Sequence, residues 1–116
     1  MLPSNYEPIA GKHPELRTAL GRISDWVRQH REWDLLDPRV LAKDLRDLDA
    51  QQLAAALVVL GTSELFRRVF MVTTPSGSLA DGKYESPRQI PGRLADRFEQ
   101  YFDTAESDVV PVLTAR

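Results

Sequence analysis

The sequence predicts an α+β fold in which three helices precede a β-hairpin. Leucines recur at helical spacing in two neighbouring stretches, first Leu41, Leu45 and Leu48 and then Leu53, Leu57 and Leu60. Residues 65–74 are rich in Phe, Val and Thr, which is the composition of a strand. Two turn signals follow, Pro75-Ser76-Gly77 and Asp81-Gly82, and they allow the chain to fold back on that strand.

Length and composition are those of one ordinary globular domain. The chain has 116 residues, of which 42% are hydrophobic and 28% charged, enough for one core. It has no cysteine, which excludes disulfides and thiolate chemistry, and we expect a cytoplasmic location. The longest apolar run, residues 53–60, is far shorter than the roughly 20 residues of a membrane span. The N-terminus also lacks the apolar core of a signal peptide.

The N-terminal part of the chain predicts an arm followed by a helix. Residues 1–13 hold two prolines, a glycine and few large apolar side chains, so we expect an extended arm. The apolar face of the first helix, residues 14–30, is formed by Leu16, Leu20, Ile23 and Val27. Pro14 suits the first turn of this helix. Trp26 and Trp33 bracket its end and are expected at the edge of the core.

The second and third helices each carry a capping signal at their start. Asp37 precedes a helix that has Pro38 at its first position. Asp49 is expected to cap the third helix, residues 50–60, by accepting hydrogen bonds from its first backbone amides. We expect Gly61 to end this helix in a left-handed conformation.

Three further strands and a fourth helix complete the prediction. A short strand is expected at residues 33–36, and residues 83–86 are expected to return beside the main strand with Tyr84 turned toward the core. A fourth helix over residues 92–102 is predicted from apolar side chains at helical spacing, namely Leu94, Phe98, Tyr101 and Phe102, with Phe98 in the core. The final strand, residues 109–113, contains Pro111 and is therefore expected at a sheet edge.

This order of elements resembles the winged helix-turn-helix superfamily, with three helices, a β-hairpin wing, an extra C-terminal helix and a short terminal strand. The resemblance is carried by the strand that closes at Pro75-Ser76-Gly77 and by two leucine-rich helices, through Leu41, Ala42, Leu45, Leu53, Leu57 and Leu60. Where the family has a small residue between these helices, this chain has Asp47-Leu48. We expect residues 1–13 to form an arm, 14–86 the winged-helix domain, and 87–116 a helical extension packed on the same domain.

The resemblance implies DNA binding, with the third helix in the major groove and the wing on the backbone. Charge argues against this for the helix, because residues 50–60 contain no Lys or Arg. Three carboxylates crowd its start, Asp44, Asp47 and Asp49. Gln51 and Gln52 could read adenine edges, although solvated polar residues in a first turn are the simpler interpretation.

The predicted wing is more basic than the helices. Residues 65–93 contain five basic residues, Arg67, Arg68, Lys83, Arg88 and Arg93, against two acidic ones, Asp81 and Glu85. Such a wing could touch a phosphate backbone, meet an acidic protein, or be an ordinary solvated hairpin. The net charge of the whole chain is −2, so there is no overall attraction to nucleic acid or to an anionic membrane.

No pattern in the sequence indicates an enzyme. The two histidines, His13 and His30, have no cysteine beside them and no zinc-binding spacing. There is no glycine-rich phosphate loop, and Ser24, Ser63 and Ser86 lack the context of a catalytic nucleophile. We therefore expect a protein without catalytic residues, cofactor or metal.

The sequence predicts a protein-interaction module that serves as an accessory or adaptor protein. The alternative is a DNA-binding transcriptional regulator that uses the third helix and the basic wing. The candidate binding surface consists of Gln51, Gln52, Ala55, Arg67, Arg68, Lys83 and Arg88. We expect a protein partner rather than DNA, at most weak non-specific DNA binding, and no membrane contact; the sequence is also compatible with a homodimer.

Overall fold

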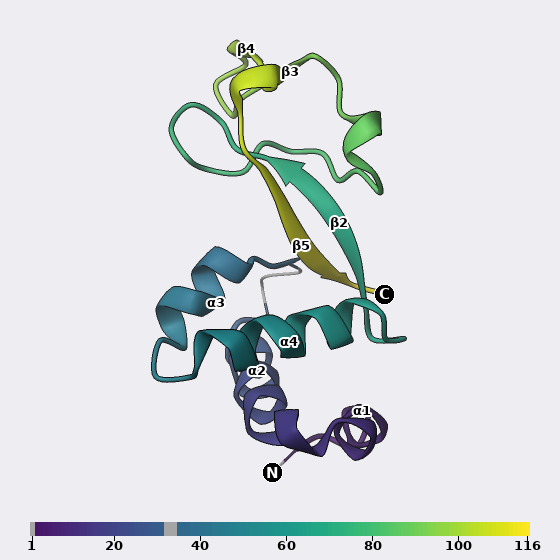
Figure 1. The fold of residues 1–116 in the computed structure, drawn as a ribbon. Helices are drawn as coiled ribbons and strands as arrows, with labels where there is room; N and C mark the ends of the chain where they lie inside the picture. The colour runs from purple at the N-terminus through teal and green to yellow at the C-terminus, as the bar shows by residue number, and fades with distance from the viewer. Residues whose placement is uncertain (1, 32–34) are drawn as a thin grey trace. The chain divides into compact units, whose positions relative to one another are not determined.

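The protein is a mixed α+β chain, described by a computed structural model over residues 2–31 and 35–116 (Figure 1). The described residues form four α-helices, α1 (Glu7–Lys12), α2 (Arg17–Gln29), α3 (Pro38–Asp44) and α4 (Ala50–Gly61). They also form five strands, β1 (Leu35–Leu36), β2 (Phe66–Val72), β3 (Arg93–Ala95), β4 (Tyr101–Asp103) and β5 (Val109–Ala115). Within these residues no helix has the length and apolar character needed to cross a membrane.

The chain divides into two compact units. Unit 1 comprises Met1–Arg67 and Leu113–Arg116, and unit 2 comprises Arg68–Val112. The boundary therefore falls inside two strands, β2 and β5. This division differs from the predicted one, in which residues 87–116 were a helical extension of a single domain.

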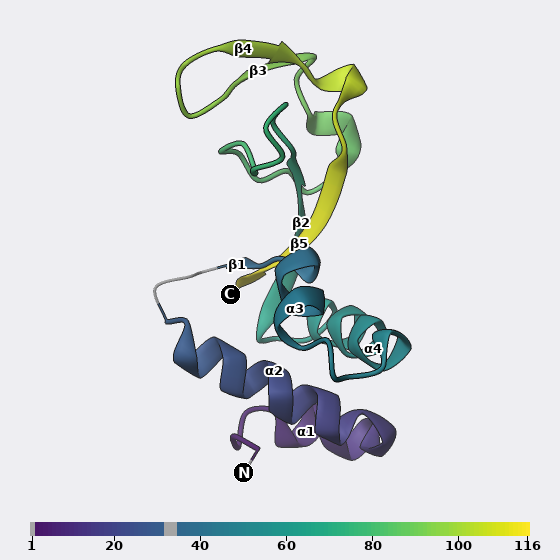
Figure 2. The same ribbon diagram turned by 90° about the vertical axis from the view of Figure 1, so that its left-hand side faces the viewer.

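Unit 1 is built around a helical core to which α2, α3 and α4 all contribute (Figure 2). Most of the apolar residues that predicted these helices are buried in one cluster, namely Leu16, Leu20, Ile23, Leu41, Leu45, Leu53, Leu57 and Leu60. Val27 and Leu48 are partly buried and pack against this cluster. The three predicted helices are thus confirmed. A 3₁₀ turn at Pro14–Leu16 precedes α2, and Trp26 is buried in the same core. Trp33 lies outside the described residues.

The predicted N-terminal arm is wrong, because residues 7–12 form helix α1. Pro8 is in its first turn, where a proline is tolerated. Tyr6 and Ala10 lie one helical turn apart and are both buried in the core of unit 1, with Ile9 packed beside them. Burial of this small apolar side offsets the weak helix propensity of the segment.

The capping predictions hold at the helix starts but not at the end of α4. Asp37 accepts a hydrogen bond from Arg39 N (2.9 Å), and Asp49 accepts from Gln51 N (2.7 Å) and Gln52 N (3.2 Å). Gly61 is the last residue of the helix and does not adopt a left-handed conformation. The hydroxyls of Thr62 and Ser63 donate instead to the carbonyl oxygens of residues 59 and 60, which removes the need for a left-handed glycine.

The main sheet has the strand order β1-β5-β2. Strand β1 pairs antiparallel with β5, with Leu35 opposite Thr114 and Leu36 opposite Leu113. The predicted last strand is confirmed, but β5 is the middle strand rather than an edge. Pro111 is accommodated because β1 reaches only Leu113 and Thr114, so the missing N–H group falls outside that pairing.

Unit 2 begins with the predicted wing, which closes more loosely than expected. Thr73 bridges to Leu79 and Phe70 to Tyr84, so the expected return strand at residues 83–86 is reduced to one bridge. Gly82 has φ +117, and a Cβ there would lie 2.7 Å from the Tyr84 hydroxyl, so this turn requires glycine. Tyr84 is half-buried and does not join the helical core. Val69 is buried within unit 2 and is not part of the helical core either.

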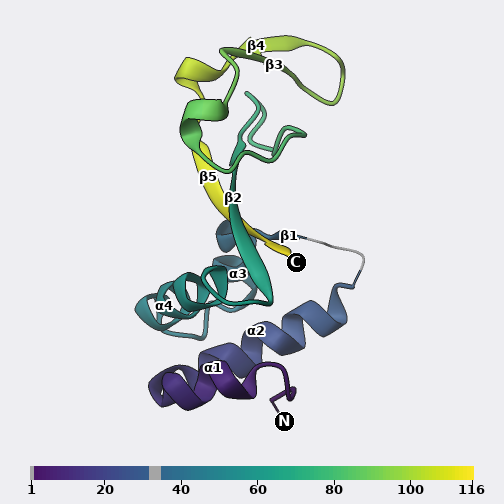
Figure 3. The same cartoon turned by 90° about the vertical axis from the view of Figure 1, so that its right-hand side faces the viewer.

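The predicted fourth helix, residues 92–102, is wrong, since this segment forms the β3–β4 hairpin (Figure 3). Leu94 pairs directly with Phe102 across the hairpin, so the spacing that resembled a helix belongs to two strands. The Asp96 side chain accepts hydrogen bonds from Phe98 N (2.8 Å) and Gln100 N (3.0 Å), which stabilises the turn. Phe98 is 76% exposed rather than in the core.

Candidate functional site

Helix α4 presents an exposed face without any charged side chain. Its buried side contributes Leu53, Ala56, Leu57 and Leu60 to the core. The opposite side exposes Gln51, Gln52, Ala54, Ala55 and Val58, and three of these, Gln51, Gln52 and Ala55, belong to the predicted binding surface. Val58 is the large apolar side chain of this face and is 67% exposed. This face offers amide groups and small apolar groups to whatever lies against it.

The three carboxylates near the start of α4 are held by partners within unit 1. Asp49 caps the helix, and Asp44 accepts a hydrogen bond from the indole of Trp26. Asp47 forms a bidentate ion pair with the Arg22 guanidinium of α2, in which each carboxylate oxygen accepts one hydrogen bond. The hydrogen bonds from Arg22 lower the pKa of the Asp47 carboxyl, so it stays ionised to lower pH than a free aspartate.

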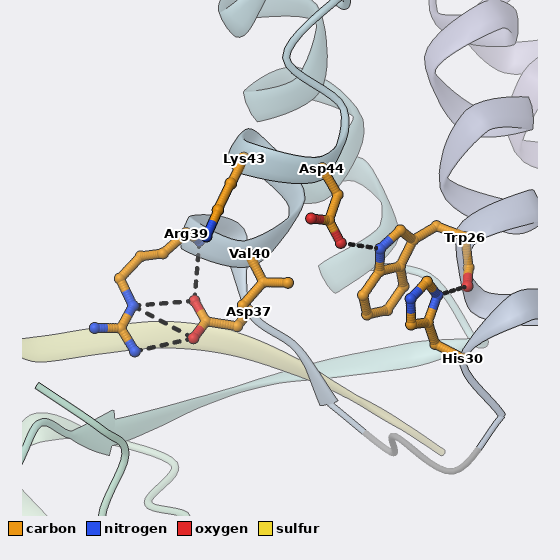
Figure 4. A pocket seen from close by; sticks show the side chains of 7 residues that line it. All are labelled: Trp26, His30, Asp37, Arg39, Val40, Lys43 and Asp44. Atoms are coloured by element: carbon orange, nitrogen blue, oxygen red, sulfur yellow. Dashed lines mark hydrogen bonds and ion pairs between the residues drawn. The ribbon is translucent and has the colours of Figure 1, made fainter.

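An open pocket of about 490 Å³ lies between the end of α2 and helix α3 (Figure 4). It is lined by Trp26, His30, Asp37, Arg39, Val40, Lys43 and Asp44. Two acidic and two basic side chains therefore share one concave surface with an aromatic pair. No pattern in the sequence predicted this pocket.

One wall of the pocket is an aromatic stack. The rings of Trp26 and His30 lie 4.0 Å apart with an interplanar angle of 13°. His30 Nδ1 lies 2.7 Å from the Trp26 carbonyl oxygen, and Trp26 Nε1 donates to Asp44 Oδ2 over 2.8 Å. The four-residue spacing of Trp26 and His30, which places both on one side of a helix, is the signal that could have revealed this wall.

The opposite wall is an ion pair at the start of α3. Asp37 is only 6% exposed, and its carboxylate accepts from the backbone N of Arg39 and from the Arg39 guanidinium, with Nη2 to Oδ2 at 3.0 Å. Asp37 is thus both helix cap and buried counter-ion. Within each wall the polar groups are hydrogen-bonded to one another. Among the described residues no group of three His, Cys, Asp or Glu side chains is arranged to bind a metal. The polar side chains of the pocket therefore have a structural role, since they connect α2 to α3 and cap the start of α3.

The seven predicted binding-surface residues are divided between the two units. Gln51, Gln52 and Ala55 share the exposed face of α4 in unit 1, as described above. Arg67 and Arg68 are both exposed neighbours in β2, but adjacent strand residues point to opposite faces of a sheet. Arg68 lies over the Phe70 ring at 5.3 Å, a cation–π contact within unit 2.

The remaining two predicted residues belong to unit 2. Lys83 is exposed and immediately precedes the bridge residue Tyr84. Arg88 is exposed in the 3₁₀ turn Pro87–Gln89, which Ser86 caps by accepting a hydrogen bond from Arg88 N. These cations thus lie on separate short segments of unit 2 rather than in one continuous helical row.

Comparison of the chain with protein-family models, with curated proteins and with solved structures found no match. The resemblance to winged helices therefore has no structural or sequence relative beside it. What this protein binds is therefore inferred from the exposed side chains of the two units.

Proposed function

We propose that this chain is a small non-enzymatic protein with a winged-helix arrangement that acts as an adaptor, binding a protein partner through the exposed face of α4. The order of α2, α3, α4, β2 and the turn at residues 75–77 supports the winged-helix arrangement. The functional proposal rests on the uncharged exposed face of α4, which includes the exposed Val58.

The chemistry of this face suits a protein partner better than a phosphate backbone. Binding to duplex DNA depends on Lys and Arg side chains that neutralise phosphates, and α4 has none. Ala54 and Ala55 allow a partner backbone to approach closely, while the neighbouring glutamines retain hydrogen-bonding capacity. A partner that covers Val58 removes apolar surface from water without desolvating a charge.

The interaction is tested with a photo-crosslinking amino acid placed at Ala55 of the full chain in its native host. We expect crosslinks to one or a few discrete proteins, and their loss when Val58→Asp is added. The matched control places the same amino acid at Thr18, which is exposed on α2. The same crosslinked species from both positions, or none from Ala55, would contradict the proposal.

A DNA-binding regulator is the second candidate, favoured by one observation, the exposure of Arg68, Lys83 and Arg88 in unit 2. These cations support backbone contact without base reading. We therefore expect duplex binding no tighter than the ~10⁻⁴–10⁻⁶ M of non-specific association.

Fluorescence anisotropy with genomic fragments at about 150 mM salt separates the two candidates. Weak binding that falls in the double variant Arg67→Ala/Lys83→Ala, and does not change in Gln51→Ala/Gln52→Ala, agrees with the adaptor. A specific site bound at nanomolar strength and lost on Gln51→Ala would establish the regulator instead.

A further inference from the structure

The β3–β4 hairpin of unit 2 exposes two aromatic side chains. Phe98 at its turn is 76% exposed and Tyr101 in β4 is 70% exposed. The hairpin is a separate sheet of two strands with three residues each. A two-stranded hairpin is marginally stable in water unless further packing covers it. A partner that covers the exposed aromatic side chains would therefore stabilise the hairpin.

The turn of the hairpin is built to hold one conformation. Asp96 N donates to Gln100 O (2.9 Å), and the Asp96 carboxylate accepts from two further backbone amides. Glu99 has φ 62, a left-handed conformation that side-chain-bearing residues rarely adopt. Figures 2 and 3 both show this turn on the side of unit 2 away from the Pro87–Gln89 helix. A fixed, exposed turn of this kind is already ordered for an interaction.

The register of the hairpin divides its side chains between two faces. Arg93 is opposite Asp103 and Ala95 is opposite Tyr101, so these four share one face, which we call the outer face. Leu94 and Phe102 form the other face and are half-buried. The Arg93 guanidinium lies 5.4 Å from the centre of the Tyr101 ring, which confirms that both side chains lie on the outer face.

We propose that the outer face is a self-association surface on which a second copy of the chain packs face to face around a two-fold axis. An axis parallel to the strands, over the middle of the hairpin, places β3 of one copy over β4 of the other. Arg93 then faces Asp103 of the second copy, and the reverse contact forms by symmetry. Ala95 likewise faces Tyr101 of the second copy, so that a small residue meets a large one.

This complementarity is what points to a second copy rather than a different protein. The outer face carries one positive and one negative side chain at the same level of the hairpin, so the two-fold arrangement places each charge opposite its counter-charge on the second copy. Tyr101 supplies apolar area on this face, and tyrosine and arginine are residues that contribute strongly to protein interfaces. The surface lies in unit 2 and does not involve α4, so the self-association proposal can be tested separately from the proposed adaptor face.

Sedimentation equilibrium of the full chain tests the proposal by charge exchange. The wild type is expected to show a concentration-dependent equilibrium between monomer and dimer. Arg93→Asp and Asp103→Arg alone should each reduce the association constant at least about tenfold, because two attractive contacts become repulsive. An equimolar mixture of these two variants should associate again, as should the double variant Arg93→Asp/Asp103→Arg.

The mixture distinguishes self-association from damage within one chain, such as loss of the hydrogen bond that Asp103 accepts from Ala105 N, since mixing cannot repair a damaged hairpin. The matched control is Arg88→Asp, which makes the same charge change at another exposed site of unit 2 and should leave the association constant unchanged. A wild type that is monomeric at all concentrations, or a mixture no more associated than its components, overturns the proposal. An equal loss with Arg88→Asp overturns it as well.

Discussion

The indole nitrogen of Trp26 donates a hydrogen bond to the carboxylate of Asp44 over 2.8 Å, which ties α2 to α3. Trp26 is only 4% exposed, so its N–H group depends on this acceptor. Asp44→Ala should therefore lower the free energy of unfolding by about 1–3 kcal/mol, measured by urea denaturation. Asp44→Asn retains an acceptor and should cost less.

The control for this bond is Lys43→Ala, a neighbouring exposed position on the same helix, which should change stability by no more than about 0.5 kcal/mol. Equal losses for Asp44→Ala and Asp44→Asn would show that the hydrogen bond to Trp26 is not what Asp44 contributes.

The two faces of α4 can be compared at adjacent positions. Leu57 is buried in the core of unit 1 and Val58 is 67% exposed. Leu57→Ala should cost about 2–5 kcal/mol, from lost burial and the cavity left behind, whereas Val58→Ala should change stability by less than about 0.5 kcal/mol. Denaturant titration of both variants measures this contrast, and a loss below about 1 kcal/mol for Leu57→Ala would contradict the described packing.

The start of α4 provides a test of helix capping. The Asp49 carboxylate accepts from two amides of the first turn, so Asp49→Ala should cost roughly 0.5–2 kcal/mol and Asp49→Asn much less. Thermal and denaturant unfolding of both variants gives the comparison. If neither substitution changes stability, the cap makes no net contribution to the folded state.

Tyr6 predicts a loss of stability at high pH. Burial raises the pKa of its phenol from 10.0 to about 12, because the charged form is poorly solvated in the core of unit 1. The folded-state pKa is above the unfolded value, so this contribution is fully present below pH 10 and is lost as the pH rises toward about 12. A shift of this size corresponds to a contribution on the order of 2–3 kcal/mol.

The measurement is the free energy of unfolding against pH for the wild type and for Tyr6→Phe, which keeps the ring but cannot ionise. The difference between the two proteins should be constant below pH 10 and should move in favour of Tyr6→Phe above it. Parallel curves over the whole alkaline range would show that Tyr6 ionises as an exposed tyrosine does.

The helices of unit 1 could be predicted because their signals are local. Asp37 and Asp49 mark the helix starts through contacts two or three residues along the chain, and leucines at helical spacing mark the buried faces. The same reasoning failed at residues 1–13, where a short apolar side is enough for a helix once it is buried against a core that the sequence alone does not reveal.

The strands of unit 2 depended on information that local spacing does not contain. Leu94 and Phe102 fit both a helix and a hairpin, and the Asp96 side chain decides between them by its bonds to the turn. The central place of β5 depends on Leu35 and Leu36, which are far away in the sequence. Of the candidate site, the exposed face of α4 could be predicted from periodicity, whereas the pocket beside Trp26 could not, because it requires the packing of α3 on α2.

Unit 1 is discontinuous in the chain, and this has a consequence for its synthesis. Leu113 belongs to its core, and Arg116 N donates to Leu65 O while the Arg116 guanidinium donates to the carbonyl oxygens of Ser63 and Phe66. When only the first 67 residues have left the ribosome, the helices have emerged without the strand that pairs with β1. Part of their apolar surface therefore stays uncovered during translation until residues 113–116 leave the exit tunnel.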